Sequence, residues 1–253
     1  MKSIKLMTHV VVGYPILKET SRLIKIMAKY ADFIELQIPF SDPLADGPTI
    51  MRVCEQSLRN GTTVLDALKL AKQLSGEVTI PLLFMCYFNT VFTYGVEKFV
   101  RDSKQAGIYG LIVPDMPLEE EVQEHFYEYC RKYDLPVIFV VSPITPQERL
   151  REIAKHARAF VYATARQGIT GVQDSRFNLA CRQAGNQELR KFLKRVRKYF
   201  SIPIAVGFGL STREQVQVLQ GHADIAVVGS ALIDVINRKE DVEDFLTQLS
   251  MVE

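Results

Sequence analysis

The sequence predicts an α/β protein that forms a single-domain (β/α)8 TIM barrel over residues 1–253. Short apolar runs alternate with longer amphipathic segments, and eight such runs occur. The runs are continuously apolar, which is typical of parallel strands covered on both faces by helices. Polar and glycine-rich residues follow the runs at their C-terminal ends, where barrel enzymes carry their chemistry. Eight strands with helical crossovers favour a closed barrel over an open sheet.

The expected elements follow from this alternation. Strands are expected over residues 8–12, 32–38, 81–86, 109–113, 136–141, 159–163, 202–206 and 224–228. Helices are expected over residues 19–29, 49–59, 63–74, 95–106, 118–132, 146–156, 187–199, 211–219 and 230–237. The loop from about 164 to 186 is the longest, which favours a functional segment such as a lid.

Composition excludes several classes of protein. Hydrophobic residues make up 47% of the chain, charged residues 24%, and the formal net charge is only +2, so we expect neither a nucleic-acid nor a membrane partner. The basic stretch over 189–200 has its apolar residues at helical spacing, which indicates a solvated helix face. The dispersed residues Cys54, Cys86, Cys130, Cys181, His9, His125, His156 and His222 argue against zinc or disulfides. We therefore expect no metal, reduced thiols and a cytoplasmic location.

Glycine motifs follow the last two expected strands. They are "GFG" at 207–209 and "VGS" at 228–230, with Ser230 at the start of a helix. Backbone amides and a helix N-terminus at this place form the common phosphate site of barrel enzymes. "ITG" at 169–171 offers a further amide. The alternative is ordinary turn chemistry, since glycines end strands in many proteins.

Two acidic residues stand out because of their surroundings. Glu35 lies within an apolar strand, and the period of two places it on the inward face with Phe33 and Gln37. A buried glutamate with a raised pKa suits a general acid–base, although a structural ion pair is the alternative. Asp46 lies on a proline-rich loop, where it is either a second catalytic carboxylate or a turn or helix cap before Pro48.

Several specific motifs are distributed along the chain. The most specific is "IELQIPFSDPLADGPTI" at 34–50. The others are "VVGYP" at 11–15, "YGVEKF" at 94–99, "GLIVPDMPLEE" at 110–120, "TPQERL" at 145–150, "GITG" at 168–171, "AVGFGLST" at 205–212 and "VVGSAL" at 227–232. Through these motifs the chain resembles the tryptophan synthase alpha family over its whole length.

The resemblance implies a (β/α)8 lyase of tryptophan biosynthesis that cleaves indole-3-glycerol phosphate to indole and glyceraldehyde 3-phosphate. In this reading Glu35 moves protons, Asp46 accepts the indole N–H, and Tyr162 lies near the glutamate. The implied phosphate site consists of Gly171, Phe208, Gly209, Gly229 and Ser230. The family needs no cofactor in this subunit, and it pairs with a pyridoxal-phosphate-dependent beta subunit in an α2β2 complex. The loops around Asp42 and Thr170 are expected to become ordered with that partner.

Several positions depart from the family pattern. Gln37 replaces a usual glycine, and we expect its amide to lie beside Glu35, facing the substrate space. The other departures are Tyr30 for glycine, Thr90 for proline and Ala165 for serine. The alternative function is an alpha subunit with weak or no lyase activity that mainly activates its beta partner. A third interpretation, a sugar-phosphate isomerase, is disfavoured by the motif "PFSDPLADGP".

Overall fold

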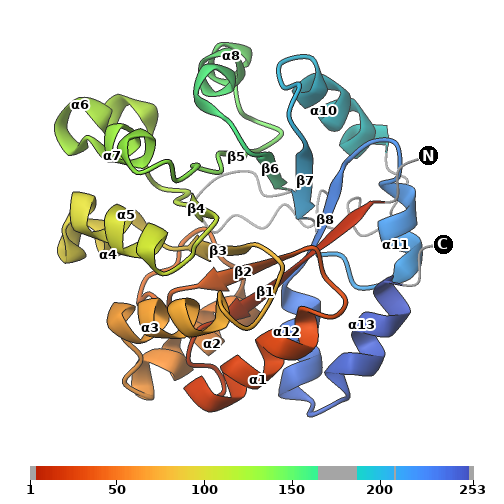
Figure 1. The fold of residues 1–253 in the computed structure, drawn as a ribbon. Helices are drawn as coiled ribbons and strands as arrows, with labels where there is room; N and C mark the ends of the chain where they lie inside the picture. The colour runs from red at the N-terminus through yellow and green to blue at the C-terminus, as the bar shows by residue number, and fades with distance from the viewer. Residues whose placement is uncertain (1–3, 165–186, 208, 251–253) are drawn as a thin grey trace.

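The computed structural model describes residues 4–164, 187–207 and 209–250. In this part of the chain, strands and helices alternate around a ring, with the strands inside and the helices outside (Figure 1). Within this part, no helix is long and apolar enough to cross a lipid bilayer.

The eight strands form one parallel sheet in the order β4-β3-β2-β1-β8-β7-β6-β5. Their bounds are β1 Lys5–Val11, β2 Phe33–Gln37, β3 Leu82–Met85, β4 Gly110–Ile112, β5 Val140–Val141, β6 Val161–Thr164, β7 Ile204–Gly207 and β8 Ile225–Val228. A parallel bridge between Leu111 and Val137 joins the two edges. This bridge closes the sheet, as the strand count predicted.

The helices lie between the strands at nearly every predicted place. Their bounds are α1 Leu17–Met27, α2 Pro48–Arg59, α3 Val64–Leu74, α4 Phe88–Tyr94, α5 Val96–Gln105, η1 Leu118–Glu120, α6 Glu121–Glu124, α7 Phe126–Lys132, α8 Gln147–His156, α10 Gln187–Arg197, α11 Arg213–Val218, α12 Ser230–Asn237 and α13 Val242–Ser250. The sequence interpretation missed α4 and α13.

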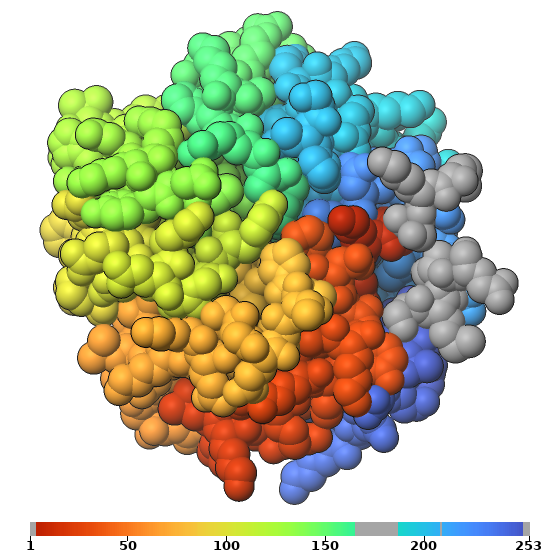
Figure 2. Space-filling model, in the orientation of Figure 1, coloured from red at the N-terminus to blue at the C-terminus, as the bar shows by residue number. Residues whose placement is uncertain are grey.

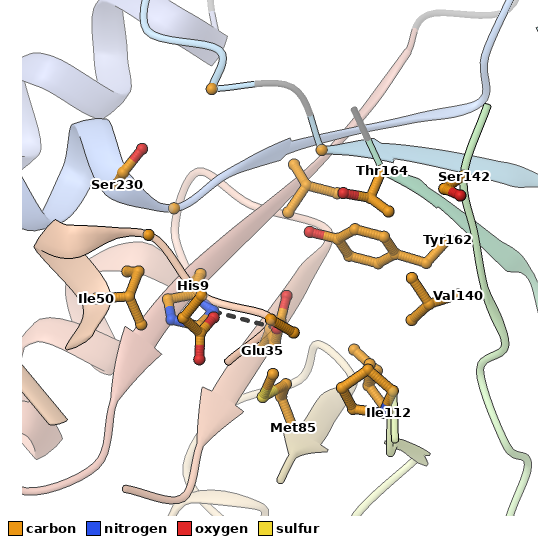
Figure 3. A pocket seen from close by; sticks show the side chains of 18 of the residues that line it. His9, Glu35, Ile50, Met85, Ile112, Val140, Ser142, Tyr162, Thr164 and Ser230 are labelled. Carbon is orange, nitrogen blue, oxygen red and sulfur yellow. Dashed lines mark ion pairs between the residues drawn. The ribbon is translucent and has the colours of Figure 1, made fainter. Parts of the chain in front are cut away.

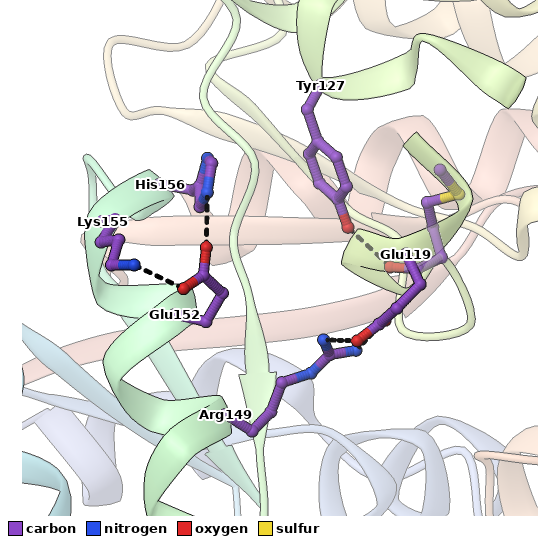
Figure 4. Close-up of polar contacts among 7 residues, drawn as sticks. Glu119, Tyr127, Arg149, Glu152, Lys155 and His156 are labelled. Atoms are coloured by element: carbon purple, nitrogen blue, oxygen red, sulfur yellow. Dashed lines mark hydrogen bonds and ion pairs between the residues drawn. The ribbon is translucent and has the colours of Figure 1, made fainter. Parts of the chain in front are cut away.

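The predicted helix over 118–132 is wrong as one element. His125 adopts a left-handed conformation, with φ of 53°, and separates α6 from α7. The Glu121 carboxylate accepts the backbone N–H groups of Tyr127 and Glu128, each at 2.7 Å, and so caps the new helix. Figure 4 shows this region beside α8, where Arg149 forms a two-pronged ion pair with Glu119.

The side chains of the strands divide between two apolar layers. On β2, Ile34 and Leu36 belong to the large cluster that packs against the surrounding helices. Phe33 packs against a second cluster inside the barrel, which includes Met7 and Leu83 from the neighbouring strands. The predicted alternation on β2 is therefore confirmed, and it directs Glu35, one step beyond Ile34, to the barrel interior.

The beginning and the end of the chain pack together. Figure 2 shows the red N-terminal and the blue C-terminal surfaces meeting at the lower right of the molecule. Between them, the hydroxyl of Tyr30 donates to Glu243 of α13 at 2.8 Å, and Lys29 forms an ion pair with the same carboxylate. Tyr30, which departs from the family pattern, thus fastens α13 to the end of α1.

Candidate active site

A cavity of about 530 Å³ lies at the C-terminal ends of the strands (Figure 3). Both polar and apolar residues line it. The lining includes His9, Glu35, Asp46, Tyr162, Gly209, Gly229, Ser230 and Asp234, together with the apolar residues Ile50, Met85, Ile112, Val140 and Ile144. The cavity therefore brings together the predicted site residues that the structure describes.

Glu35 lies on β2 inside the barrel and is only 4% exposed. The register of β1 and β2 pairs it with His9, so the two side chains project side by side. Glu35 Oε1 lies 3.2 Å from His9 Nδ1, while Glu35 Oε2 is buried without a hydrogen-bond partner among the described residues. The ion-pair alternative is thus correct for one oxygen, and the other oxygen is free to meet a ligand.

His9 is a polar residue of the cavity that sequence reasoning missed. Burial alone lowers the pKa of its imidazole, but the negative charges of Glu35 and Asp46 outweigh burial, and the pKa is raised above 6.5. The signal was a polar residue within an otherwise apolar strand, as for Glu35. Recognising it required the pairing of β1 with β2, which places the two residues opposite each other.

Asp46 is held by two side chains and does not cap the following helix. Helix α2 begins after Gly47, which makes no side-chain cap hydrogen bond. Instead, Asp46 Oδ2 accepts from Gln37 Nε2 at 2.7 Å and from the Tyr87 hydroxyl at 2.9 Å. Burial raises the pKa of Asp46, and the positive charge of His9 opposes that rise. The carboxylate is therefore fixed at the mouth of the barrel.

Gln37 occupies a different place from the one predicted. It is fully buried, and its amide contacts Asp46 instead of Glu35. It is also absent from the residues that line the cavity. The physical reason is the sharp return of the chain after β2, which brings Asp46 back over the strand and within reach of the amide. The expected position of the Gln37 amide, beside Glu35 and facing the substrate space, is thus wrong.

Tyr162 projects from β6 into the cavity that Glu35 also lines (Figure 3). Its hydroxyl lies over Gly207 at the end of β7. A Cβ at position 207 would be 2.5 Å from the hydroxyl oxygen, which is too close for any side chain. Gly207 therefore serves to admit the tyrosine.

The start of α12 forms part of the cavity wall. Gly229 and Ser230 line it, and no side chain caps this helix, so its first backbone amides have no intrahelical partner. Gly209 also lines the cavity, with φ of 68°. These groups have the arrangement that favours an anion. Gly171, Phe208, Ala165 and Thr170 lie outside the described residues.

The whole chain matches known proteins of one kind. The family model described as "Tryptophan synthase alpha chain" matches residues 1–252. The chain belongs to the tryptophan synthase alpha chain family. A relative from Desulfotalea psychrophila is 40% identical over 237 residues, which cover 93% of this chain and 89% of the relative. A relative from Methanocaldococcus jannaschii is 40% identical over 230 residues, which cover 90% and 78%.

Solved tryptophan synthases have the same fold. A mutant alpha subunit from Pyrococcus furiosus superposes with a TM-score of 0.86 at 30% identity, over all of both chains. A tryptophan synthase chain from M. tuberculosis gives 0.85 at 29% identity, over 98% of this chain and 92% of that one. The TIM-barrel prediction is confirmed. The protein is a lyase of the tryptophan synthase alpha family, which cleaves indole-3-glycerol phosphate, and the alternative of an inactive subunit is not favoured.

Among the residues that the structure describes, no group of three His, Cys, Asp or Glu is arranged to hold a metal ion. The three described cysteines, Cys54, Cys86 and Cys130, are free and buried. Burial raises the pKa of the Cys54 thiol to about 12, so this thiol is neutral near pH 7.

Proposed function

We propose that Glu35 and Asp46 carry the cleavage of indole-3-glycerol phosphate in this chain, with Glu35 as the acid–base group. The supporting observation is that two carboxylates with different partners line one cavity. Glu35 has a buried oxygen without a partner, whereas Asp46 is fixed by two donors. Carboxylates in different environments can divide acid–base and electrostatic roles.

The chemistry requires one proton to be added and one to be removed. Protonation of the ring carbon that bears the glycerol chain makes the indole nitrogen positive. Removal of the proton from the adjacent glycerol hydroxyl then breaks the carbon–carbon bond, and the bonding electrons return to the ring. We assign these proton transfers to Glu35 Oε2, in support of which this oxygen is buried without a hydrogen-bond partner among the described residues. Asp46 stabilises the nitrogen where the positive charge develops.

We assign the two ends of the substrate to two groups of cavity-lining residues. The phosphate is proposed to bind the amides around Gly209, Gly229 and Ser230, together with Gly171 and Phe208. The indole ring is proposed to contact the apolar lining residues, near Tyr162 and Met85. Binding at both ends would hold the glycerol chain across Glu35.

A pyridoxal-phosphate-dependent beta subunit is the proposed partner, in an α2β2 complex, and this chain itself is proposed to need no cofactor. The side chain of Leu44, on the loop that carries Asp46, is 63% exposed beside the cavity and offers an apolar contact for that partner. We further propose that the chain acts as one domain over 1–253 in the cytoplasm, in keeping with its single described sheet and free thiols.

Turnover of indole-3-glycerol phosphate, measured with and without a beta subunit, tests this function. We expect formation of indole in both cases and faster formation with the partner, because closure of loops over a barrel site assembles the catalytic groups. Hydrogen exchange of residues 41–47 and 164–180 in the same two states tests the contact. Absence of indole in both states would refute the lyase role, and equal exchange would refute the loop coupling.

A further inference from the structure

His9 and Gln37 lie between the two carboxylates of the site. His9 is on β1 and Gln37 is on β2, and both side chains are buried. His9 Nδ1 lies 3.2 Å from Glu35 Oε1, and Gln37 Nε2 donates to Asp46 Oδ2 at 2.7 Å. Each of the two residues thus contacts one carboxylate.

Each residue also has a second polar atom that lacks a partner. His9 Nε2 and Gln37 Oε1 are both buried without a hydrogen bond among the described residues. The orientation of the Gln37 amide follows from Asp46, because a carboxylate accepts only and the NH2 group must face it. The Gln37 oxygen is therefore an acceptor that lacks a donor. A buried acceptor without a hydrogen bond destabilises the folded state.

The missing donor is supplied if His9 carries both protons. With Nδ1–H directed at Glu35, a neutral ring would present a bare Nε2 acceptor to the Gln37 oxygen, which is unfavourable. An imidazolium instead donates from both nitrogens. We propose that His9 and Gln37 are positioning residues that form one hydrogen-bonded bridge, Glu35–His9–Gln37–Asp46, which holds both carboxylates through a protonated imidazole.

The charges around His9 support this protonation state. Its pKa is affected most by burial, which lowers it, but Glu35 and Asp46 raise it above 6.5, and the nearby Gln37 side chain also raises it. Asp234 of α12 lines the same cavity and adds a further carboxylate. Cys54 of α2 stays neutral, because burial raises its thiol pKa to about 12. No other cation lines the described cavity.

The bridge rests on the proposed function for its catalytic meaning. The His9 contact occupies Glu35 Oε1 and leaves Oε2 for the substrate. The Gln37 contact fixes Asp46. Because one imidazolium lies between the two carboxylates, it offsets their mutual repulsion in a buried setting where charges interact strongly. Loss of either positioning residue should therefore affect both carboxylates.

The test that does not need activity is ¹⁵N NMR of the histidine rings. At neutral pH we expect both ring nitrogens of His9 to carry hydrogen. Gln37→Met keeps the side-chain length, removes both polar atoms, and should lower the midpoint of the His9 titration. The signals of His125, His156 and His222 should be identical in the two proteins. A bare Nε2 in the parent protein, or an unchanged His9 midpoint in the variant, would overturn the bridge.

The second test is a double-mutant cycle on kcat/KM for indole formation with the beta subunit. His9→Asn and Gln37→Met should each lower kcat/KM about tenfold, because each removes a hydrogen bond to a charged group. The double variant should be no slower than the worse single variant. If the loss of kcat/KM in the double variant equals the product of the losses in the two single variants, the bridge is contradicted. The control is Gln56→Met, the same substitution on the exposed face of α2, which should leave kcat/KM unchanged.

A parent protein that forms no indole would refute the proposed function without deciding the bridge, which the NMR titration decides independently. If His9 is doubly protonated and responds to Gln37→Met, the bridge exists whether or not the enzyme turns over. If the titration fails while indole forms normally, only the bridge is lost.

Discussion

The Tyr87 hydroxyl donates to Asp46 Oδ2 at 2.9 Å and accepts the backbone N–H of Ala45 at 3.0 Å. Tyr87 is nearly fully buried, and its ring stacks on Phe40 with centroids 5.2 Å apart. Tyr87, which follows β3, thus holds the loop that carries Asp46 at two points, in addition to the Gln37 contact from β2. The position of Asp46 should depend on this hydroxyl.

Tyr87→Phe should lower kcat/KM for indole formation about tenfold, since a hydrogen bond to a charged group contributes roughly 1.5–3 kcal/mol. The hydroxyl lowers the pKa of Asp46, so its removal should move the acid limb of the pH–rate profile to higher pH. Tyr94→Phe is the matched control, because that hydroxyl donates to Asp102, which does not line the cavity. An unmoved acid limb would contradict the role of Tyr87.

Glu35→Gln should abolish most of the turnover while the fold is kept. The amide has the size of the carboxylic acid but cannot transfer a proton, and positioned proton transfer contributes a factor of about 100 to 10,000. Indole formation with the beta subunit is the measurement. Glu55→Gln, an exposed residue on α2, is the control. A correctly folded Glu35 variant with parental turnover would remove Glu35 from the mechanism.

Gly207→Ala should displace Tyr162 from the cavity. The new methyl group would lie 2.5 Å from the tyrosine hydroxyl, so the ring must move or the strands must separate. We expect a loss of about 1–3 kcal/mol in the free energy of unfolding, as for other overpacked sites, together with a higher KM. Gly76→Ala is the control, since its methyl group would meet only one backbone oxygen, at 3.6 Å. Equal stability of the two variants would contradict the prediction.

Stability should fall as the pH rises above about 6.5, and His9 should be a main cause. Its folded-state pKa is raised, so its contribution is complete below the unfolded pKa and is lost as the pH rises through the folded value. The pKa of Asp46 is also raised, from its ordinary value of 3.8. Its contribution to the free energy of unfolding therefore also decreases as the pH rises, but this decrease begins at a lower pH, above 3.8.

Urea unfolding of the parent protein and of His9→Asn between about pH 6 and pH 8 measures this effect. The variant should show a shallower fall in the free energy of unfolding. The upper limit of the pH range matters because buried thiols also make the free energy of unfolding depend on pH. The pKa of Cys54 is about 12 in the folded protein, whereas an unfolded cysteine ionises at about pH 8.5, so above that pH the folded state loses stability for a second reason. Parallel slopes in the two proteins would rule out His9 as the source.

Much of the fold followed from the sequence because strand and helix periods are local properties. The inward direction of Glu35 needed only the alternation along β2, and the structure confirms it. The break at His125 was not readable, since it depends on the Glu121 side chain capping α7. Helix α4 has no charged residues, so the usual contrast between its faces is weak.

The contacts that the sequence did not predict at the site depend on which residues lie next to each other in the folded barrel. The sequence placed Gln37 on the correct face but gave it the wrong neighbour, since the return of the loop to β2 is a tertiary feature. His9 was passed over because its partner lies 26 positions further along the chain, and only the β1–β2 register joins them. Side chains that meet across strands thus carried the information that local patterns lack.

The closure between β4 and β5 has a mechanical consequence. β1 is seven residues long and pairs with β2 from Met7 to Val11, whereas β5 has two residues and the seam beside it is joined through the Leu111–Val137 bridge. His9 and Glu35 stand on the well-paired strands, while Ile112 and Val140 of the apolar lining stand at the seam. Backbone pairing is therefore more extensive beside His9 and Glu35 than at the seam beside Ile112 and Val140, so the seam is the part of the barrel that should separate more easily.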